Sequence, residues 1–425
     1  MADKREQEGM LSGYRVLDLC DDRGFYCGKI FADLGADVIK IEPPGGDLSR
    51  NIGPFYKDIP HPEKSLYWWA YNTSKRGITL NIETADGKDI FRRLVKTADI
   101  IVESFPPGYM DSLGLGYSAL IKINPGIIMT SITPFGQTGP YKDYKAPDLV
   151  VWALGGQVFA TGDDDRPPCR IGFPQAYFCA GNHAASATMA ALYWRELSGE
   201  GQFIDVSTQE AVFWTLQIVI NFWEFMKFNI PRGGVTRKTP WGPEIRFAFP
   251  CKDGHVGFTL GSGYFASISM PQMVAWMARE GRLGALEPMK DWTRKDWGEK
   301  ADVFSLTKEE FDTWQNSVTD FFADKTKAEL YEQARKNNIM LLPASNAKEL
   351  ADNLQLKARE FYVEVEHPEV GETITYAGAP YKIAEGAWRI SRRAPFIGEH
   401  NAEIYERELS LSKEDMRLLK EAGVI

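Results

Sequence analysis

The chain has 425 residues, of which 25% are charged, and a net charge of −9. Phosphate backbones are bound by basic patches, so this charge balance disfavours nucleic acid as a partner. No apolar stretch reaches the roughly 18–20 residues that a membrane span requires, and residues 1–9 lack the apolar core of a signal peptide. We therefore expect a cytoplasmic protein of two or three domains.

Short apolar runs and amphipathic stretches alternate over the first 140 residues. Strands are predicted at Tyr14–Leu19, Asp37–Glu42, Ile100–Glu103 and Ile127–Ile132, with helices at Gly28–Leu34 and Ala85–Lys96. Such alternation is typical of an α/β fold with a parallel sheet of the Rossmann type. The segment after the first strand, Cys20–Gly24, lacks the glycine-rich dinucleotide fingerprint, so the sheet does not imply NAD.

The composition of the chain changes after residue 230. A long helix rich in small residues is predicted at Phe178–Leu197, and Gly, Pro and aromatic residues then dominate Pro231–Pro250, which we interpret as a linker. We expect residues 1–210 and 326–425 to form a large domain, with linkers and a smaller domain in residues 211–325.

Cysteine and histidine are few and scattered. The chain has five of each, with no CxxC pair and no HExxH cluster. Zinc sites and disulfide frameworks depend on such spacings, so we expect neither of them, and no metal in catalysis.

Seven segments, in one order along the chain, resemble the class III CoA-transferases, the family of formyl-CoA transferase and carnitine CoA-transferase. They are FADLGADVIKIEPPGGD (Phe31–Asp47), NTSKRGITLNI (Asn72–Ile82), DIIVESFPPGYMDSLGLGY (Asp99–Tyr117), NPGIIMTSITPFGQTGPY (Asn124–Tyr141), LSGEGQFIDVSTQEA (Leu197–Ala211), LQLKAREFYVEVEHPEVG (Leu354–Gly371) and RRAPFIGEH (Arg392–His400).

The resemblance implies both a fold and a reaction. The expected fold has a Rossmann-like large domain and a smaller α+β domain, with two subunits interlocked like links of a chain. Members of the family move CoA from an acyl-CoA donor to a free carboxylate through an aspartate nucleophile, which splits one difficult exchange into easier steps. The CoA thioester is then a substrate, and no tightly bound cofactor is expected.

The family's nucleophilic aspartate lies in a run resembling V-G-x-P-x-A-D-x-x-x-G. The matching run here is Ile171–Gly181, and it aligns without a gap, which puts Tyr177 at the aspartate position. A phenol has an ordinary pKa near 10 and cannot form the acyl anhydride that a carboxylate forms. The racemases of this fold pair that aspartate with a histidine, whose position is Pro147 here, so the racemase reaction is also disfavoured.

Four residues match positions that line the family's CoA cleft, and they are Asn72, Lys75, Arg76 and Ser104. For Lys75 and Arg76, plain surface charge is the competing interpretation. An arginine that helps the family hold the CoA nucleotide is replaced by Ser112. After the first strand, Arg23 could bind a substrate carboxylate in a bidentate contact, and a structural salt bridge is an equal alternative.

Two classes of function fit these residues. The chain would be the aspartate-lacking subunit of a heteromeric transferase, beside a homologous subunit that carries the aspartate; the two-subunit member it resembles most is the succinyl-CoA:(R)-benzylsuccinate CoA-transferase of anaerobic toluene degradation. Alternatively, it would form a homodimer that binds acyl-CoA without turnover. A third possibility is an active enzyme with a substitute carboxylate, for which Asp148 is the nearest candidate.

Overall fold

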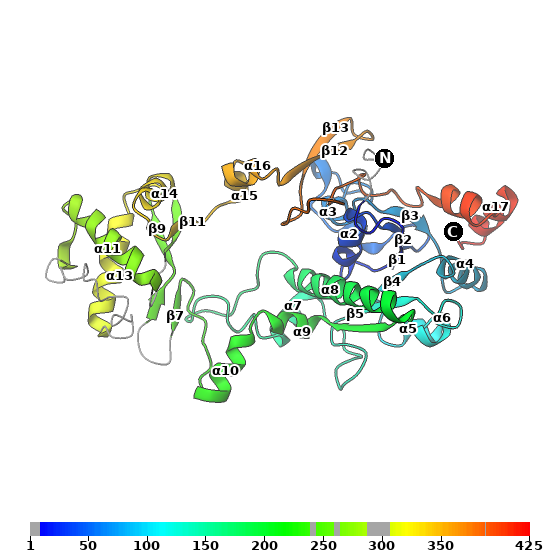
Figure 1. The fold of residues 1–425 in the computed structure, drawn as a ribbon, viewed down its shortest axis with the longest axis horizontal. Helices are drawn as coiled ribbons and strands as arrows, with labels where there is room; N and C mark the ends of the chain where they lie inside the picture. Colours follow the sequence, from blue (N-terminus) through cyan, green and yellow to red (C-terminus); the bar gives the residue numbers. More distant parts are fainter. Residues whose placement is uncertain (1–8, 239–243, 259–263, 287–306, 387) are drawn as a thin grey trace. The chain divides into compact units, whose positions relative to one another are not determined.

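The computed structural model describes residues 9–238, 244–258, 264–286, 307–386 and 388–425 (Figure 1). Two compact units make up the chain. The first unit consists of Met1–Gly155, Gly172–Thr215 and Leu354–Ile425, and the second consists of Gly156–Ile171 and Leu216–Asn353.

A six-stranded parallel sheet forms the centre of the first unit. Its strands are β1 (Arg15–Leu19), β2 (Asp37–Glu42), β3 (Arg76–Thr79), β4 (Ile100–Glu103), β5 (Ile128–Thr133) and β6 (Phe203–Ser207). They lie in the order β3-β2-β1-β4-β5-β6, and every pairing is parallel. The predicted α/β fold with a parallel sheet is therefore confirmed.

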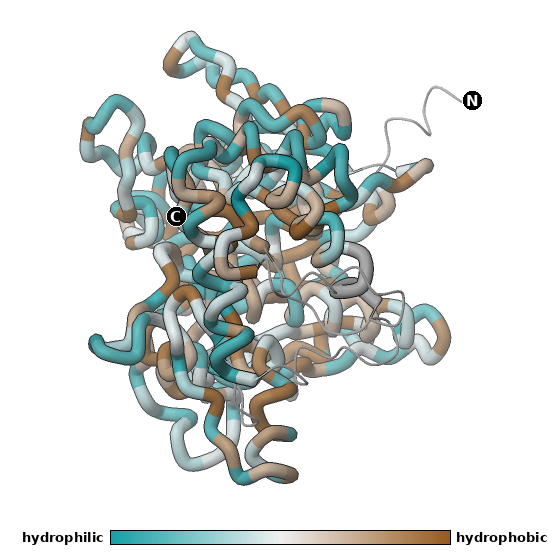
Figure 2. The backbone as a smooth tube through the Cα atoms, turned by 90° about the vertical axis from the view of Figure 1, so that its left-hand side faces the viewer, coloured by the Kyte–Doolittle hydropathy of each residue, from teal (hydrophilic) through white to brown (hydrophobic). Residues whose placement is uncertain are grey.

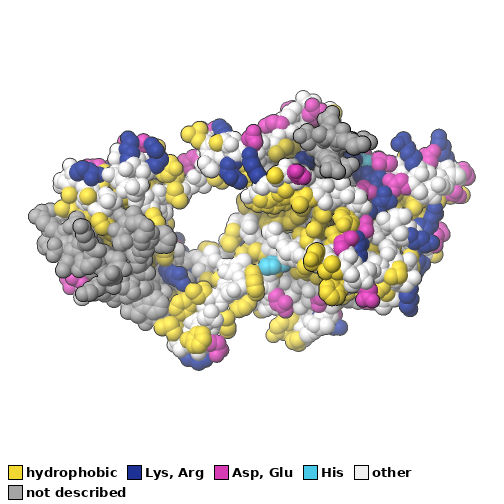
Figure 3. All heavy atoms as spheres, viewed as in Figure 1, with side chains coloured by type: hydrophobic (Ala, Val, Ile, Leu, Met, Phe, Trp, Pro, Cys, Tyr) yellow, Lys and Arg dark blue, Asp and Glu magenta, His cyan; other side chains and the backbone are white. Residues whose placement is uncertain are grey.

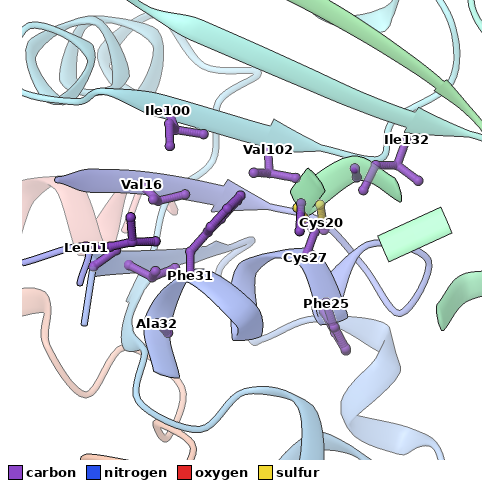
Figure 4. Close-up of a cluster of buried hydrophobic side chains, with 14 of the residues drawn as sticks. Leu11, Val16, Cys20, Phe25, Cys27, Phe31, Ala32, Ile100, Val102 and Ile132 are labelled. Carbon is purple, nitrogen blue, oxygen red and sulfur yellow. The ribbon is translucent and has the colours of Figure 1, made fainter. Parts of the chain in front are cut away.

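The sheet is covered on both faces, which explains its nearly continuous apolar strands. Successive side chains of a strand point to opposite faces, so Val16 and Leu17 enter different cores. Val16 packs with α2 (Phe25–Asp33) and α8 (Gln175–Ser198), and Figure 4 shows Phe31 of α2 reaching toward the sheet beside Val16 of β1. Leu17 packs in the core that contains α4 (Ala85–Val95) and the C-terminal residues.

Shorter elements complete the first unit. Its other helices are α3 (Leu66–Tyr71), α5 (Tyr109–Ser112), α6 (Tyr117–Leu120), α7 (Asp148–Leu154), α9 (Thr208–Trp214), α16 (Leu354–Ala358) and α17 (Lys413–Glu421), with 3-10 turns η1 (Leu48–Asn51) and η2 (Tyr56–Asp58) and a π-helical segment η5 (Ala402–Glu408). Strands β12 (Tyr362–His367) and β13 (Glu372–Ala377) form an antiparallel hairpin.

The second unit has an α+β architecture. Its strands are β7 (Thr236–Lys238), β8 (Glu244–Arg246), β9 (Ala248–Cys251), β10 (Gly254–Phe258) and β11 (Leu341–Pro343), and its helices are α10 (Gln217–Met226), α11 (Tyr264–Arg279), α13 (Lys308–Phe322), α14 (Lys327–Lys336) and α15 (Ala347–Ala351). Strands β9, β10 and β11 form an antiparallel sheet. Phe249, Phe258 and Trp314 belong to its separate aromatic core.

The division between the units differs from the predicted domain boundaries. Residues 326–353 were expected in the large domain, and the structure groups them with the second unit. The physical reason is local: β11 pairs with β10, and Leu330 of α14 is buried in the second core. Residues 156–171 also join the second unit, where the Arg232 guanidinium donates to the carbonyl oxygens of Asp163 and Arg166.

Hydrophobic and hydrophilic segments alternate along the backbone of the chain (Figure 2). None of the described helices combines the length and the apolar composition that a bilayer crossing would require.

Candidate functional site

A cleft lies at the carboxyl ends of the central strands of the first unit. The chain runs outward along the sheet in both directions from the neighbouring strands β1 and β4, and open α/β sheets bind ligands at such a switch point. A cavity of about 780 Å³ lies there, lined by the loops after β1, β2, β3 and β4. We call it the switch-point cleft, and its lining includes Asp21, Asp22, Arg23, Glu42, Ser104 and Tyr109.

A second pocket, of about 370 Å³, contains Tyr177, and we call it the Tyr177 pocket. Tyr177 lies in the first turn of α8 and is only 8% exposed. Pro147 and the cations Lys142 and Lys145 also line this pocket. Asp22 and Arg23 line both cavities, so the switch-point cleft and the Tyr177 pocket adjoin at these two residues.

Tyr177 is a neutral phenol at neutral pH. Burial, followed by the negative charge of Asp22, raises the pKa of its hydroxyl above the ordinary value of 10.0, against a hydrogen bond from the Asp148 backbone that lowers it. A neutral phenol can donate or accept a hydrogen bond, but it cannot form an acyl anhydride. Neither Tyr177 nor Pro147 therefore supplies a carboxylate nucleophile to this pocket.

The Arg23 guanidinium forms an ion pair with the nearby Asp21 carboxylate. Its Nε and Nη2 atoms donate to the Asp21 carboxylate at 2.5–2.9 Å. Burial would lower the pKa of the Arg23 guanidinium, but its hydrogen bonds and charge interaction with Asp21 outweigh burial and raise it. Arg23 therefore stays cationic between the two cavities, and a substrate carboxylate would compete with Asp21 for the same edge of the guanidinium.

Asn72 and Lys75 belong to a buried polar cluster beneath α2. Both side chains are 0% exposed, and the Lys75 ammonium donates to Asp18 at 2.7 Å, to Asn72 at 2.9 Å and to the carbonyl oxygen of Phe25 at 3.0 Å. Those three bonds use all the N–H donors of a lysine. Neither residue lines the switch-point cleft, and their contact with CoA stays a prediction.

Arg76 lies at the amino end of β3, whereas the switch-point cleft lies at the carboxyl ends of the strands. Its guanidinium pairs with Asp37, Glu403 and Glu408 at 2.6–2.7 Å. Ser104 is the one predicted CoA-cleft residue that lines the cleft, directly after β4. Its Oγ donates to the Asp21 carboxylate and accepts from the Asp21 N–H, both at 2.9 Å.

Asp148, the candidate substitute nucleophile, is 5% exposed. It begins α7, and its Oδ1 accepts a hydrogen bond from the Ala176 N–H at 3.0 Å. That bond satisfies one of the amides that the start of α8 leaves without an intrahelical partner. A structural role at the start of α8 accounts for this contact.

Two carboxyl groups that sequence reasoning missed lie near the cleft. Burial and the charge of Asp21 raise the pKa of Asp22 to about 6. Glu103 ends β4, is 3% exposed, and burial raises its pKa to about 7. Two features of the sequence could have indicated them. Asp21 and Asp22 form an acidic pair directly after the first strand, and Glu103 ends an otherwise apolar strand.

Among the described residues, no group of three or more His, Cys, Asp or Glu side chains is placed to hold a metal ion.

Comparison with known proteins places this architecture in one family. A model of CoA-transferase family III matches residues 11–401. The chain is 37% identical to subunit BbsE of the succinyl-CoA:(R)-benzylsuccinate CoA-transferase of Thauera aromatica, over 92% of this chain and 93% of that one. It is 34% identical to a formyl-CoA:oxalate CoA-transferase of Streptomyces avermitilis, over 98% and 99%.

The fold is similar to that of a CaiB/BaiF family protein from Brucella suis, with a TM-score of 0.77 and 25% identity, covering 94% of this chain and 99% of that one. It is also similar to a protein from Mycobacterium tuberculosis, with a TM-score of 0.74 and coverage of 93% and 99%. A match over almost the whole chain, together with a parallel sheet and its switch-point cleft, leads to one conclusion: the chain belongs to the class III CoA-transferase family.

Proposed function

We propose that this chain is the non-nucleophilic subunit of a heteromeric CoA-transferase. The observation that carries the proposal is the Tyr177 pocket, in which a buried neutral phenol stands at the start of α8. We predict from the sequence that this is the position of the family's aspartate. The proposed partner is a homologous subunit with that aspartate, interlocked with this chain.

The division of labour follows from the chemistry of the reaction. The partner's aspartate attacks the carbonyl carbon of the donor thioester and releases CoA thiolate, which leaves a mixed anhydride. The thiolate then attacks the aspartyl carbonyl, frees the donor acid and forms an aspartyl thioester. The acceptor carboxylate attacks that thioester, which releases CoA thiolate and forms a second mixed anhydride. The thiolate then attacks the acceptor's acyl carbon in this anhydride, which forms the product thioester and restores the aspartate. This chain supplies the fold partner and part of the site's surroundings.

The proposed donor is succinyl-CoA and the proposed acceptor is (R)-benzylsuccinate. The support is similarity: the BbsE relative is described as a subunit of an enzyme for these two substrates. Relatives from Chloroflexus aurantiacus and Haloarcula hispanica that use succinyl-CoA with other acids, each 30% identical, also favour the donor.

The first test is the native mass of the complex purified from its own cells. We expect a second, different chain of about the same size. A homodimer of this chain alone would overturn the heteromeric proposal. CoA binding without turnover would then indicate an acyl-CoA-binding protein, whereas turnover lost in Asp148→Asn would indicate a substitute carboxylate.

The second test is the variant Tyr177→Phe in the complete complex. It removes the hydroxyl and keeps the ring, so we expect the turnover rate to stay within about twofold of the wild type. Replacing the partner's aspartate should lower the rate by at least about a thousandfold. A tenfold loss in Tyr177→Phe would show that the phenol takes part in the reaction and contradict the proposal.

A further inference from the structure

We propose that the switch-point cleft of this subunit excludes CoA, so that the enzyme binds one CoA thioester per pair of unlike subunits, in the partner's cleft. The count of one per pair rests on the proposed heteromeric function. The exclusion itself rests on the charges and the backbone amides of this chain.

The cleft is acidic. Its described lining carries one cationic side chain, Arg23, against five carboxyl groups, which belong to Asp21, Asp22, Glu42, Asp47 and Glu83. Two of the five are neutralised within the protein. Arg23 pairs with Asp21 at 2.5 Å, and Arg50 pairs with Glu42 at 2.6 Å.

The other three carboxyl groups give the cleft its net charge. Glu83 accepts a hydrogen bond from the Tyr109 hydroxyl at 2.7 Å, and Asp47 accepts one from the Ser49 N–H at 2.7 Å. Neither donor carries a positive charge. Asp22 is partly buried, and with a pKa of about 6 it is mostly ionised at neutral pH. CoA brings a diphosphate and a phosphomonoester, so its approach is opposed by like charges.

Several backbone donors in the loops around the cleft already have partners within the protein. Phosphates at strand ends bind to exposed backbone N–H groups of loops and helix starts. Here five such groups donate to side-chain oxygens of the protein itself at 2.6–3.1 Å, and they belong to Asp21, Asp22, Arg23, Asp47 and Phe105. A phosphate would have to break these bonds, and the one cation of the described lining, Arg23, is already paired with Asp21.

The two cations that match the family's CoA cleft by sequence form ion pairs outside the switch-point cleft. Lys75 is enclosed with Asp18, and Arg76 is paired at the opposite end of β3. Neither lines the cleft to offset its acidic residues.

Equilibrium dialysis of the wild-type complex against CoA tests the inference without any variant. We expect saturation at one CoA per pair of unlike subunits. Two per pair would overturn the exclusion and leave the heteromeric function intact. If the purified protein is a homodimer of this chain, the heteromeric function is wrong, whatever the CoA binding. For that homodimer, the absence of CoA binding would support the exclusion of CoA, and one CoA per chain would overturn the exclusion.

The triple variant Asp22→Asn, Asp47→Asn, Glu83→Gln tests the cause. Each change keeps the size of the side chain and removes one negative charge, which weakens repulsion on the order of fivefold per charge. We expect a second, weaker CoA site in the complex, with affinity that rises on the order of a hundredfold over the wild-type cleft. A folded variant that still binds one CoA would overturn the charge argument.

A matched control removes the same number of charges outside the cleft. Asp89, Glu200 and Glu385 are exposed on the first unit and do not line the cleft. The variant Asp89→Asn, Glu200→Gln, Glu385→Gln should keep one CoA per pair. A second site in this control would show that net charge, and not the cleft, governs binding, and would overturn the inference.

Discussion

Buried charges near the strand ends of the first unit are held by partners distant in the sequence. The Asp18 carboxylate lies at 2.7 Å from the Lys75 ammonium, and both are 0% exposed. Burial alone would raise the pKa of Asp18, but the charges of Lys75 and Lys40 outweigh it and lower that pKa. Asp18 is therefore ionised and paired, and the cluster ties β1 to the segment before β3.

The pKa of Glu103 shifts in the opposite direction, because the effect of burial, which raises it, outweighs the hydrogen bonds, which lower it. Its pKa rises from 4.5 to about 7, against the N–H of Phe105, which donates to its carboxylate at 2.6 Å. A carboxyl group whose pKa is raised on folding binds more protons in the folded state than in the unfolded state. The free energy of unfolding then falls as the pH rises from the unfolded to the folded pKa.

We predict that Glu103→Gln stabilises the protein in a pH-dependent way. At pH 5 the glutamic acid is already neutral in the folded state, so the free energy of unfolding should change little. At pH 8 the variant should be more stable by about 2 kcal/mol, because it removes the cost of ionising a buried carboxyl group. Urea unfolding at both pH values measures this.

The control for that prediction is Glu83→Gln. Glu83 is exposed, and surface substitutions change stability by about 0.5 kcal/mol or less. An equal effect of Glu103→Gln at pH 5 and pH 8 would contradict the raised pKa.

At the scale of elements, α8 brings Tyr177 to the site through its small residues. The helix has Ala176, Ala180, Ala184 and Ala185 on its buried side, with Gly181 beside them. A Cβ on Gly181 would lie 3.0 Å from the Cβ of Tyr26 and 3.3 Å from the backbone nitrogen of Cys27. A side chain at this position would therefore require α8 and α2 to move apart slightly.

We predict that Gly181→Val destabilises the first unit by about 2 kcal/mol, because the added methyl groups meet the backbone of α2. Thermal unfolding of the purified complex measures the change. Ala190→Val is the control, since Ala190 is exposed on the same helix and reports only the intrinsic helix preference of valine. Equal effects of the two substitutions would contradict the close packing of α2 and α8.

At the scale of the whole molecule, the second unit exposes an apolar helix. None of the residues of α10 is buried, although Ile218, Ile220, Trp223, Phe225 and Met226 are large and apolar. Figure 3 shows hydrophobic side chains gathered where Figure 1 places α10. Exposed apolar patches of this kind mark protein interfaces, and the proposed partner subunit would cover this one.

We predict that Phe225→Glu weakens assembly with the partner by at least about tenfold, because Phe225 is 86% exposed in this chain and a charge would be desolvated in an apolar interface. Sedimentation of the complex over a dilution series measures the dissociation. Asn221→Glu adds the same charge at another exposed position of α10 that is already polar, and it should weaken assembly less. Unchanged assembly in Phe225→Glu would exclude α10 from the interface.

The sequence by itself determined the family and the parallel sheet, and it predicts Tyr177 at the position of the nucleophile. These features depend on local information. Apolar runs such as Ile100–Glu103 form strands buried on both faces, and the run around Tyr177 aligns without a gap. The strand positions at Asp37–Glu42 and Ile100–Glu103 agree with the structure at every residue.

Only the tertiary structure decided what the charged residues do. Lys75 and Arg76 are adjacent in sequence, yet one is enclosed with Asp18 and the other pairs with residues as distant as Glu403. The tertiary structure also places residues 326–353 in the second unit. It brings side-chain oxygens to the backbone N–H groups around the cleft, which donate hydrogen bonds to them. The reason is physical: a charge or an N–H group binds whichever partner the fold brings within about 3 Å, and sequence spacing does not specify that partner.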